Sequence, residues 1–226
     1  MTECRGDLVA LVPCRNEESS IARVIDDLRS IGVTEILVGL DPASSDATAQ
    51  IASARGASVV ISPASGYDAP CLAGLEHLRS QGYRGSVLFL DAGNKYVMST
   101  VGDLLDAVDP AADITLGVRD SQWHWHQRFG NGLFRTAVRI RFRHRLLDVS
   151  SLRVMNMDVL NQLNLEDRQF SLPFQTVLHA LAREMTLQYV PIRCTPTRSG
   201  SSKVSGLWRN SLKAGRQMGL SFFRIR

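Results

Sequence analysis

The first ninety residues alternate short apolar runs with segments whose apolar residues recur at helical spacing. Each run is continuous, as expected for strands that are buried on both faces of a sheet. The expected strands cover residues 8–13, 35–40, 57–61 and 86–90. One expected helix begins near Ser19, and two more cover residues 46–54 and 69–81. This order predicts right-handed crossovers and a mostly parallel central sheet flanked by helices, which is the α/β fold class.

Polar loops follow three of these strands, at residues 13–17, 41–46 and 91–95. In open α/β sheets, ligands bind outside the carboxyl ends of the strands. We therefore expect the three loops to converge on one crevice.

The second half of the chain is less regular. Strands are expected at residues 114–119 and 187–192, and helices at residues 123–147, 170–184 and 207–218. Residues 195–205 are rich in Ser, Gly and Pro and are expected to form a loop. Because no repeat or linker is evident, the 226 residues are expected to form a single domain.

The basic residues are unevenly placed in a chain whose formal net charge is +4. No Asp or Glu follows Glu184, and a second basic cluster lies between Arg128 and Arg145. Such stretches attract a nucleotide, a nucleic acid or an anionic membrane surface. A solvated basic face is the plainer alternative.

The four cysteines form no C-x-x-C pair, which argues against a zinc or thioredoxin-type site. Scattered cysteines suit a reducing compartment. The first residues lack the apolar core of a signal peptide, and no stretch approaches the roughly 20 apolar residues of a membrane span. We therefore expect a cytoplasmic protein, with peripheral contact to the inner face of the membrane left open.

Five segments, in chain order, resemble the motifs of family 2 glycosyltransferases. They are residues 12–18 (VPCRNEE), 40–48 (LDPASSDAT), 66–75 (GYDAPCLAGL), 89–93 (FLDAG) and 198–203 (RSGSSK). The last segment is similar to a loop of the polyprenyl-phosphate branch, which resembles dolichol-phosphate mannosyltransferase. The resemblance implies a single Rossmann-like nucleotide-diphospho-sugar transferase (GT-A) domain. Residues 1–118 would form the nucleotide-sugar half, and residues 119–226 the acceptor half with its basic C-terminal segment.

The resemblance also implies which residues bind the nucleotide-diphosphate sugar. They are Pro13, Arg15, Asn16, Glu17, Asp41, Ala69 and Asp91. Asn16 and Glu17 can hydrogen-bond a base edge and ribose hydroxyls, although Asn16 and Ser19 are also good helix caps. Asp41 is placed to hold base or ribose, whereas Asp46 fits better as a cap of the following helix.

Asp91 stands where the family carries the first acid of an Asp-x-Asp motif that binds Mg²⁺ or Mn²⁺ against the diphosphate. The second acid is replaced by Gly93, and a further ligand position holds Lys95. One carboxylate plus a cation is a poor site for a hard metal, which prefers several oxygen ligands. Lys95 could replace the metal electrostatically. Alternatively, a metal could bind weakly through Asp91 and the diphosphate, or the two side chains could form a structural ion pair only.

Basic residues dominate the expected acceptor side. The acceptor-binding candidates are Arg119, Arg128, Asp148, Arg153, Arg198, Ser202 and Lys203, and the catalytic candidates are Asp91, Lys95, Arg198 and Lys203. A Gly/Ser loop with Arg and Lys cradles phosphate well. A phosphate acceptor needs no protein base, because it ionises near neutrality. A hydroxyl acceptor would need a carboxylate, for which Glu166 or Asp167 are the candidates, or else they form a surface turn.

Two further segments allow more than one interpretation. His124 and His126 flank Trp125 but have no evident third ligand, so structural or stacking roles are expected rather than a metal site. Residues 135–147 mix apolar residues with five arginines and could lie at an anionic lipid interface. They could equally form core or dimer contacts, so a homo-oligomer is also left open.

The leading hypothesis is an inverting glycosyltransferase that moves a sugar from a nucleotide-diphosphate sugar to a polyprenyl phosphate or a similar phosphate-bearing lipid. A second hypothesis keeps the enzyme class with a soluble small-molecule or peptide hydroxyl as acceptor. A third is a non-catalytic nucleotide-sugar-binding protein with a degenerate metal site. Nucleic acid is not an expected partner, because no recognition motif accompanies the basic residues.

Overall fold

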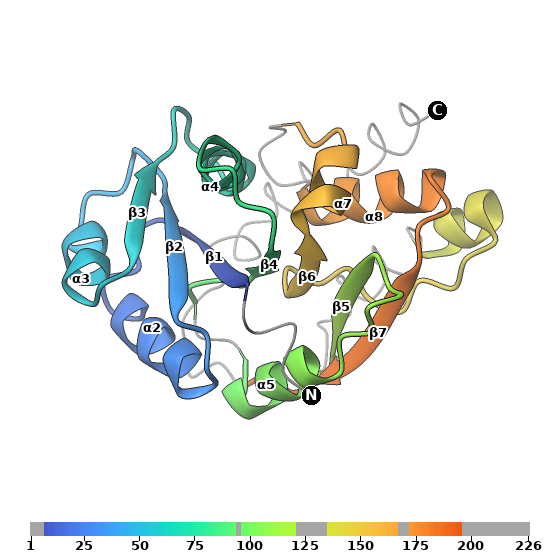
Figure 1. Ribbon diagram of the computed structural model, residues 1–226, viewed down its shortest axis with the longest axis horizontal. Helices are drawn as coiled ribbons and strands as arrows, with labels where there is room; N and C mark the ends of the chain where they lie inside the picture. The colour runs from blue at the N-terminus through green and yellow to red at the C-terminus, as the bar shows by residue number, and fades with distance from the viewer. Residues whose placement is uncertain (1–6, 94–95, 121–134, 167–171, 196–226) are drawn as a thin grey trace.

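The computed structural model describes residues 7–93, 96–120, 135–166 and 172–195. Within these residues seven strands form one sheet in the order β3–β2–β1–β4–β6–β5–β7 (Figure 1). The strands are β1 (Leu8–Cys14), β2 (Glu35–Leu40), β3 (Ser58–Ile61), β4 (Ser86–Phe89), β5 (Ile114–Arg119), β6 (Arg153–Asn156) and β7 (Leu187–Ile192). The helices are α2 (Ile21–Ser30), α3 (Thr48–Ala54), α4 (Asp68–Ser80), α5 (Met98–Asp106), α7 (Met157–Gln162) and α8 (Leu172–Ala182).

The first four strands are parallel, as the alternating pattern predicts. β1 lies between β2 and β4, and β3 pairs with the other edge of β2. β6 runs antiparallel to both of its neighbours, β4 and β5. β5 and β7 are again parallel to each other. Because β6 pairs with both β4 and β5, one continuous sheet joins the two halves of the chain.

Helices cover both faces of the sheet (Figure 1). On one face, apolar residues of α2, α3 and α5 pack against the strands in a single buried cluster. On the other face, α4, α7 and α8 form a second cluster with the alternate residues of the same strands. β1 shows the division, because Ala10 and Val12 belong to the first cluster while Val9 and Leu11 belong to the second. Burial on both faces explains the continuous apolar runs.

The start of α4 approaches the sheet unusually closely at Gly39 of β2. A Cβ at Gly39 would collide with the backbone carbonyl of Pro70. Pro70 lies in the first turn of α4, where a missing N–H costs no intrahelical hydrogen bond. This contact brings the residues before α4 toward the carboxyl ends of β1 and β2.

The fold class is confirmed, and several elements in the second half differ from the prediction. β6 and α7 were not predicted. β6 has only four residues, and its single apolar pair is flanked by Arg153 and Asn156, so no apolar run marks the strand. The helix expected over residues 123–147 is helical at residues 135–142 and ends there, where Arg143 takes a left-handed φ of 53°. Among the described residues, no helix has the length and apolar character needed to cross a membrane.

Candidate active site

The loop after β1 is fastened to the loop after β2 by hydrogen bonds. The backbone N–H of Asn16 donates to Ser44 Oγ over 2.9 Å, and Asn16 Oδ1 accepts from the backbone N–H of Ser45 over 2.8 Å. Asn16 has a φ of 52°, a left-handed conformation that asparagine tolerates better than most residues. The backbone N–H of Glu17 donates to Thr48 Oγ1 over 2.8 Å. The two loops therefore form one unit, as their expected convergence requires.

Asp46 strengthens this unit rather than facing a ligand. Its Oδ2 accepts from the backbone N–H of Glu18 over 3.0 Å, and its Oδ1 accepts from the backbone N–H of Thr48 over 3.1 Å. Thr48 is the first residue of α3. The carboxylate thus satisfies a donor at the start of that helix, in agreement with the capping role preferred for it.

Asp41 lies buried at the end of β2, with 1% of its surface exposed. Its two oxygens accept from the backbone N–H groups of Ala43 over 2.8 Å and Gly66 over 2.9 Å. Burial raises the pKa of Asp41, but these hydrogen bonds, one from Ser65 and the charge of Arg15 outweigh burial and lower it below 3.8. Arg15 Nη1 lies 4.0 Å from Asp41 Oδ2. An ionised Asp41 therefore holds three loops together, and its contact with base or ribose stays a prediction.

The carboxylate of Asp91 follows β4 and is held by two hydroxyl groups from distant parts of the chain. Tyr67, just before α4, donates to Oδ1 over 2.9 Å, and Ser151 donates to Oδ2 over 2.7 Å. The Ser151 oxygen lies 2.8 Å from the hydroxyl of Tyr96. Since the single proton of Ser151 points to Asp91, Tyr96 is the donor in this last bond.

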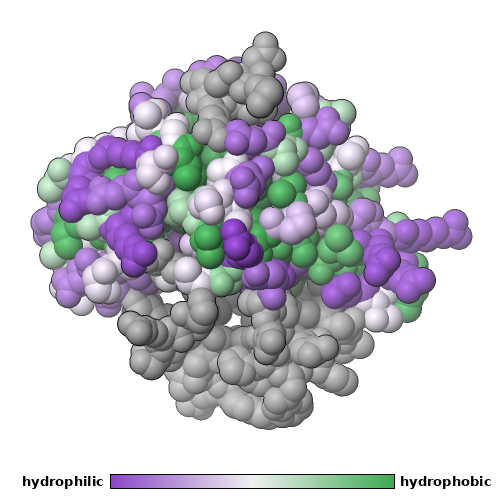
Figure 2. All heavy atoms as spheres, turned by 90° about the horizontal axis from the view of Figure 1, so that it is seen from below, coloured by the Kyte–Doolittle hydropathy of each residue, from purple (hydrophilic) through white to green (hydrophobic). Residues whose placement is uncertain are grey.

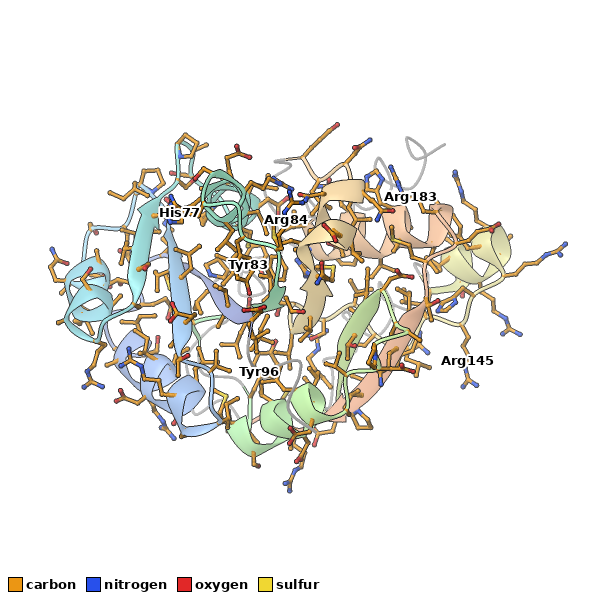
Figure 3. The ribbon with its side chains drawn as sticks, in the orientation of Figure 1. His77, Tyr83, Arg84, Tyr96, Arg145 and Arg183 are labelled. Carbon is orange, nitrogen blue, oxygen red and sulfur yellow. The ribbon has the colours of Figure 1, made fainter. Side chains whose placement is uncertain are left out.

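Both tyrosines remain protonated in this environment. Burial, followed by the charge of Asp91, raises the pKa of Tyr67 well above 10.0. The same two causes raise the pKa of Tyr96, whose side chain lies near the centre of the molecule in Figure 3. Each hydroxyl therefore acts as a donor at neutral pH, and together with Ser151 they fix the orientation of the carboxylate.

The described side chains around Asp91 offer few ligands for a metal ion. Among the described residues there is no group of three or more His, Cys, Asp and Glu side chains that could hold a metal ion. Position 93 is glycine, and both oxygens of Asp91 already accept hydrogen bonds. Mg²⁺ and Mn²⁺ prefer several oxygen ligands. A metal ion at Asp91 would need the oxygens of a bound diphosphate to complete its coordination.

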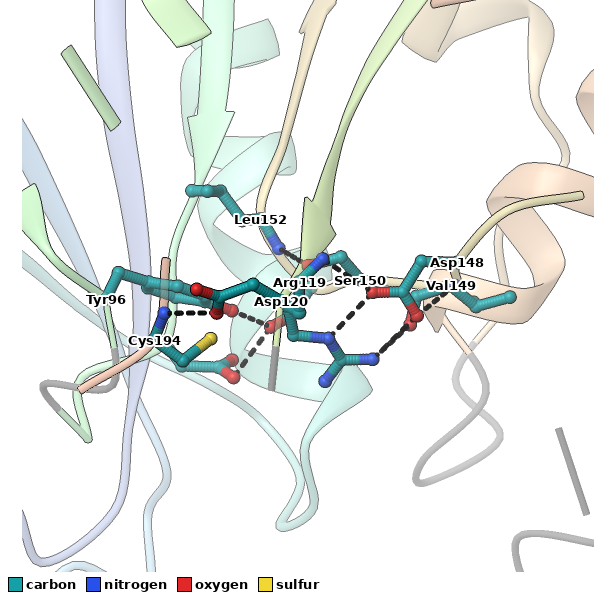
Figure 4. A network of polar contacts seen from close by, with 10 residues as sticks. Tyr96, Arg119, Asp120, Asp148, Val149, Ser150, Leu152 and Cys194 are labelled. Carbon is teal, nitrogen blue, oxygen red and sulfur yellow. Dashed lines mark hydrogen bonds and ion pairs between the residues drawn. The ribbon is translucent and has the colours of Figure 1, made fainter. Parts of the chain in front are cut away.

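Arg119 and Asp148, two of the predicted acceptor residues, bind each other (Figure 4). Arg119 Nε and Nη2 donate to Asp148 Oδ2 and Oδ1 over 2.8 Å and 2.9 Å. Although burial lowers the pKa of Arg119, the hydrogen bonds and charge of Asp148 outweigh it and raise that pKa. The same network includes Cys194, whose backbone N–H donates to Asp120 over 2.9 Å. The pair thus joins the end of β5 to the segment that leads into Ser151.

Arg153 is the most unusual predicted residue, because it is charged and fully buried. It has an exposure of 0%, and its guanidinium carbon lies 4.4 Å from the centre of the Phe89 ring. None of its three side-chain nitrogens has a hydrogen-bond partner among the described residues. The charge of Arg153 acts to lower the pKa of Tyr67, whereas the charge of Asp91 acts to raise it, so both groups lie near the Tyr67 hydroxyl. Few buried polar groups in native proteins lack a partner, so this guanidinium calls for an explanation.

The remaining predicted residues divide into two groups. Pro13 lies half-buried in β1, and Ala69 is buried at 4% exposure in the first turn of α4. Outside the described residues lie Lys95, Arg128, Arg198, Ser202 and Lys203, together with His124, His126 and Asp167. The proposed proximity of Lys95 to Asp91 therefore stays a prediction.

Sequence reasoning missed the hydroxyl groups around Asp91. Tyr67 lies in the motif-like segment at residues 66–75, and Ser151 lies between the acceptor candidates Asp148 and Arg153, but neither hydroxyl was singled out. Tyr96 directly follows the loop at residues 91–95. No spacing rule links three residues so far apart, because the antiparallel strand β6 brings Ser151 to β4.

Comparison with known proteins identifies the family. The model of the family described as glycosyl transferase family 2 matches residues 9–163. A Mycobacterium tuberculosis protein described as an uncharacterized glycosyltransferase is 30% identical over 214 residues, which cover 92% of this chain and 95% of that protein. Glycosyltransferase AglJ of Haloferax volcanii is 26% identical over 197 residues, which cover 84% of this chain and 64% of that protein.

Solved structures agree at the level of the fold. Glucosyl-3-phosphoglycerate synthase from Mycobacterium tuberculosis, in complex with UDP, has a TM-score of 0.77 at 17% identity, covering 96% of this chain and 78% of that one. Its complex with Mn²⁺, UDP and phosphoglyceric acid has a TM-score of 0.75 at 18% identity, covering 97% and 79%. The family match spans the strand ends and the Asp91 cluster described above. The chain belongs to glycosyl transferase family 2 and is a glycosyltransferase with the GT-A fold.

Proposed function

We propose that this glycosyltransferase moves a sugar, with inversion, from a nucleotide-diphosphate sugar to a phosphate-bearing acceptor of the polyprenyl-phosphate class. The observation that carries the proposal is the buried guanidinium of Arg153, which finds no hydrogen-bond partner in the part of the chain that the structure describes. Burying a charge without a partner is costly, and a guanidinium matches a phosphate with two parallel hydrogen bonds. Because Arg153 is at 0% exposure, its cover has to move when the acceptor enters.

The donor would lie across the carboxyl ends of β1, β2 and β4. The loops after β1 and β2, which are joined by hydrogen bonds, would bind the nucleotide part of the donor. Arg15 is 56% exposed there, beside the carboxylate of Asp41. Asp91 would face the sugar diphosphate from the end of β4. In this proposal Lys95, four residues after Asp91, supplies the positive charge that stabilises the diphosphate as it leaves. Complexes of structurally similar synthases contain UDP and Mn²⁺, so metal dependence is a direct test of the lysine's role.

The transfer itself would be a single displacement. A phosphate oxygen of the acceptor attacks C1 of the sugar from the face opposite the diphosphate, and the bond from C1 to the diphosphate oxygen breaks. The nucleoside diphosphate leaves with the electron pair of that bond, and the configuration at C1 inverts. A phosphate monoester has its second pKa near 6, so it attacks without losing a proton to the protein.

The state of Asp91 is consistent with a nucleophile that needs no base. Both of its oxygens accept hydrogen bonds from hydroxyl groups. A hydroxyl acceptor would require another carboxylate within hydrogen-bond reach. The sequence candidates are Glu166, which is exposed, and Asp167, which lies outside the described residues.

A soluble acceptor is the second candidate. Its support is the structural similarity to a synthase whose complex contains phosphoglyceric acid. Phosphoglyceric acid also bears a phosphate, so Arg153 could bind either acceptor. The two candidates differ in the attacking group, which is a phosphate oxygen in one case and a hydroxyl in the other.

Turnover with a set of acceptors tests the proposal. UDP- and GDP-linked sugars are incubated with a short-chain polyprenyl phosphate, with 3-phosphoglycerate or with no acceptor, and the products are identified by mass spectrometry. We expect a glycosyl phosphodiester with the polyprenyl phosphate. Product with phosphoglycerate alone would favour the second candidate, and no product with any pair would contradict the proposal.

Arg153→Met separates acceptor binding from folding. Replacing a buried charge by an apolar side chain of similar length is often neutral or stabilising, so the free energy of unfolding should be unchanged or raised. The kcat/KM for the acceptor should fall about a hundredfold, as for loss of a buried charge partner. The control is Arg84→Met, since Arg84 is 80% exposed. An unchanged acceptor KM in Arg153→Met would remove Arg153 from the site.

A further inference from the structure

The segment between Asp120 and Asp148 is strongly basic. Its 27 residues contain six arginines and no Asp or Glu. In the described part, five arginines are exposed at positions 135, 139, 141, 143 and 145. Among the described residues, Arg135, Arg139, Arg143 and Arg145 form no ion pair. The positive charge of these four exposed side chains is therefore not neutralised by an ion pair within the described residues.

The helix at residues 135–142 also presents an apolar side chain outward. Val138 is buried at 0% exposure and marks the inner face, whereas Ile140 is 77% exposed. At 100° per residue, Ile140 lies about 200° around the helix from Val138, with Arg139 and Arg141 on either side of it. An exposed isoleucine between two arginines is an amphipathic arrangement that faces away from the core.

Contacts on both sides fix the orientation of this face. Phe142 packs against the second apolar cluster, and Leu146 is buried at 1% exposure. His144 Nε2 lies 2.9 Å from the hydroxyl of Tyr189 on β7, which is an edge strand of the sheet. Leu147, 38% exposed, adds a second outward apolar side chain. The helix is therefore held against the β7 edge while its outer face remains exposed.

The figures agree with this placement. The helix lies at the end of the molecule beyond β7 in Figure 1, and Arg145 points away from the body in Figure 3. Hydrophilic side chains project from the same edge in Figure 2. We define the basic face as Arg135, Arg139, Ile140, Arg141, Arg143, Arg145 and Leu147.

We propose that the basic face docks the protein on an anionic membrane surface, with Ile140 and Leu147 entering the headgroup region. Arginine stems lie along apolar surface while their charges reach lipid phosphates. Each basic residue near such a surface contributes to binding, and buried apolar area adds to it. Nucleic acid would use the arginines but gains nothing from the exposed isoleucine. A lipid surface uses both features.

The basic face is joined directly along the chain to residues of the acceptor half of the site. From Leu147 the chain continues through Asp148, which binds Arg119, to Ser151, which binds Asp91. Docking there would place the acceptor half, rather than the loops after β1 and β2, against the membrane. This relation rests on the proposed function, whereas the docking itself does not.

Vesicle co-sedimentation of the full chain, without donor, tests the inference. Vesicles of phosphatidylglycerol mixed with phosphatidylcholine are compared with phosphatidylcholine alone at several salt concentrations. We expect binding to the anionic vesicles that weakens as salt rises. The double variant Arg139→Gln/Arg145→Gln should bind about 25-fold more weakly, and Ile140→Ser about tenfold more weakly.

Matched controls alter similar residues elsewhere. Arg23→Gln/Arg84→Gln removes two arginines that are 72% and 80% exposed, and Ile61→Ser removes an isoleucine that is 67% exposed. These controls should bind vesicles like the wild type. Absence of vesicle binding, or equal weakening in variants and controls, would overturn the inference.

Turnover distinguishes this outcome from failure of the proposed function. With a short-chain acceptor free in solution, the basic-face variants should retain wild-type activity, because none of the altered residues belongs to the candidate site. If the protein turns over the free acceptor but does not bind vesicles, only the docking proposal is rejected. If it binds vesicles but shows no turnover, only the proposed chemistry is rejected.

Discussion

At the scale of single residues, hydroxyl groups carry the organisation of the site. The carboxylate of Asp91 is oriented by Tyr67 and Ser151, and Tyr96 supports Ser151 from behind. A hydrogen bond to a charged group is worth more than one between neutral groups. In the proposed function Tyr67 is therefore a positioning residue, which would act on the donor through Asp91.

Tyr67→Phe should lower kcat about tenfold while donor KM changes little, because the ring remains and only one hydrogen bond to Asp91 is lost. Steady-state kinetics with the accepted donor measures this. Tyr83→Phe is the matched control, since its hydroxyl donates to the backbone oxygen of Asp7 away from Asp91. Equal losses of kcat in both variants would show that Tyr67 has only a structural role.

Asp41 should make stability depend on pH. Its pKa in the folded protein is lowered, so its stabilising effect is present above the unfolded pKa and is lost as pH falls through the lower, folded pKa. Urea unfolding should show Asp41→Asn less stable than the wild type at pH 7. The difference should shrink below about pH 4. A difference that stayed constant down to pH 3 would contradict this account of the three-loop junction.

At the scale of elements, the close approach of α4 to β2 sets the position of Tyr67 and the Gly66 turn. Apolar periodicity predicted β1 to β4 and α4 because each buries a continuous or helical apolar face. It could not find β6, where Arg153 stands in the middle of the sheet. In the proposed function the identity of Arg153 serves acceptor binding rather than the strand, which would explain why local pattern and structure disagree there.

Gly39→Ala tests this approach. The added methyl group would collide with the backbone of Pro70, and overpacking of this kind costs about 1–3 kcal/mol of unfolding free energy. Gly102→Ala, inside α5, is the control, because its new Cβ would meet Ile31 at 3.6 Å, an ordinary contact. There the better helix propensity of alanine should leave stability unchanged or raised. Loss of stability in both variants would mean that the close approach is not the cause.

At the scale of the whole molecule, the alternation of strands and helices along the chain predicted which loops lie together in space. Parallel strands bring their carboxyl ends to one edge, so the loops after β1, β2 and β4 could be placed beside one another from sequence alone. The hydrogen-bonded cluster of Asp91, Tyr67, Tyr96 and Ser151 needs Ser151 from the second half of the chain. The position of Ser151 depends on the antiparallel pairing of β6 with β4, which no motif encodes. The sequence therefore predicted which types of residue lie on the acceptor side, but it did not predict how those residues contact one another.

The central claim is that the ends of β1, β2 and β4 grip a nucleotide-diphosphate sugar with Asp91 at the charged centre. The direct measurement is thermal unfolding with a panel of UDP- and GDP-sugars, each with EDTA, Mg²⁺ or Mn²⁺, for the wild type, Asp91→Asn and Lys95→Ala. A ligand that binds the native state raises the melting temperature by mass action.

We predict that one donor stabilises the wild type even with EDTA, and that this shift is lost in Asp91→Asn and reduced in Lys95→Ala. A shift that appeared only with Mg²⁺ or Mn²⁺ and was unchanged in Lys95→Ala would contradict the lysine's role. No shift with any donor, or an equal shift in Asp91→Asn, would contradict the central claim itself.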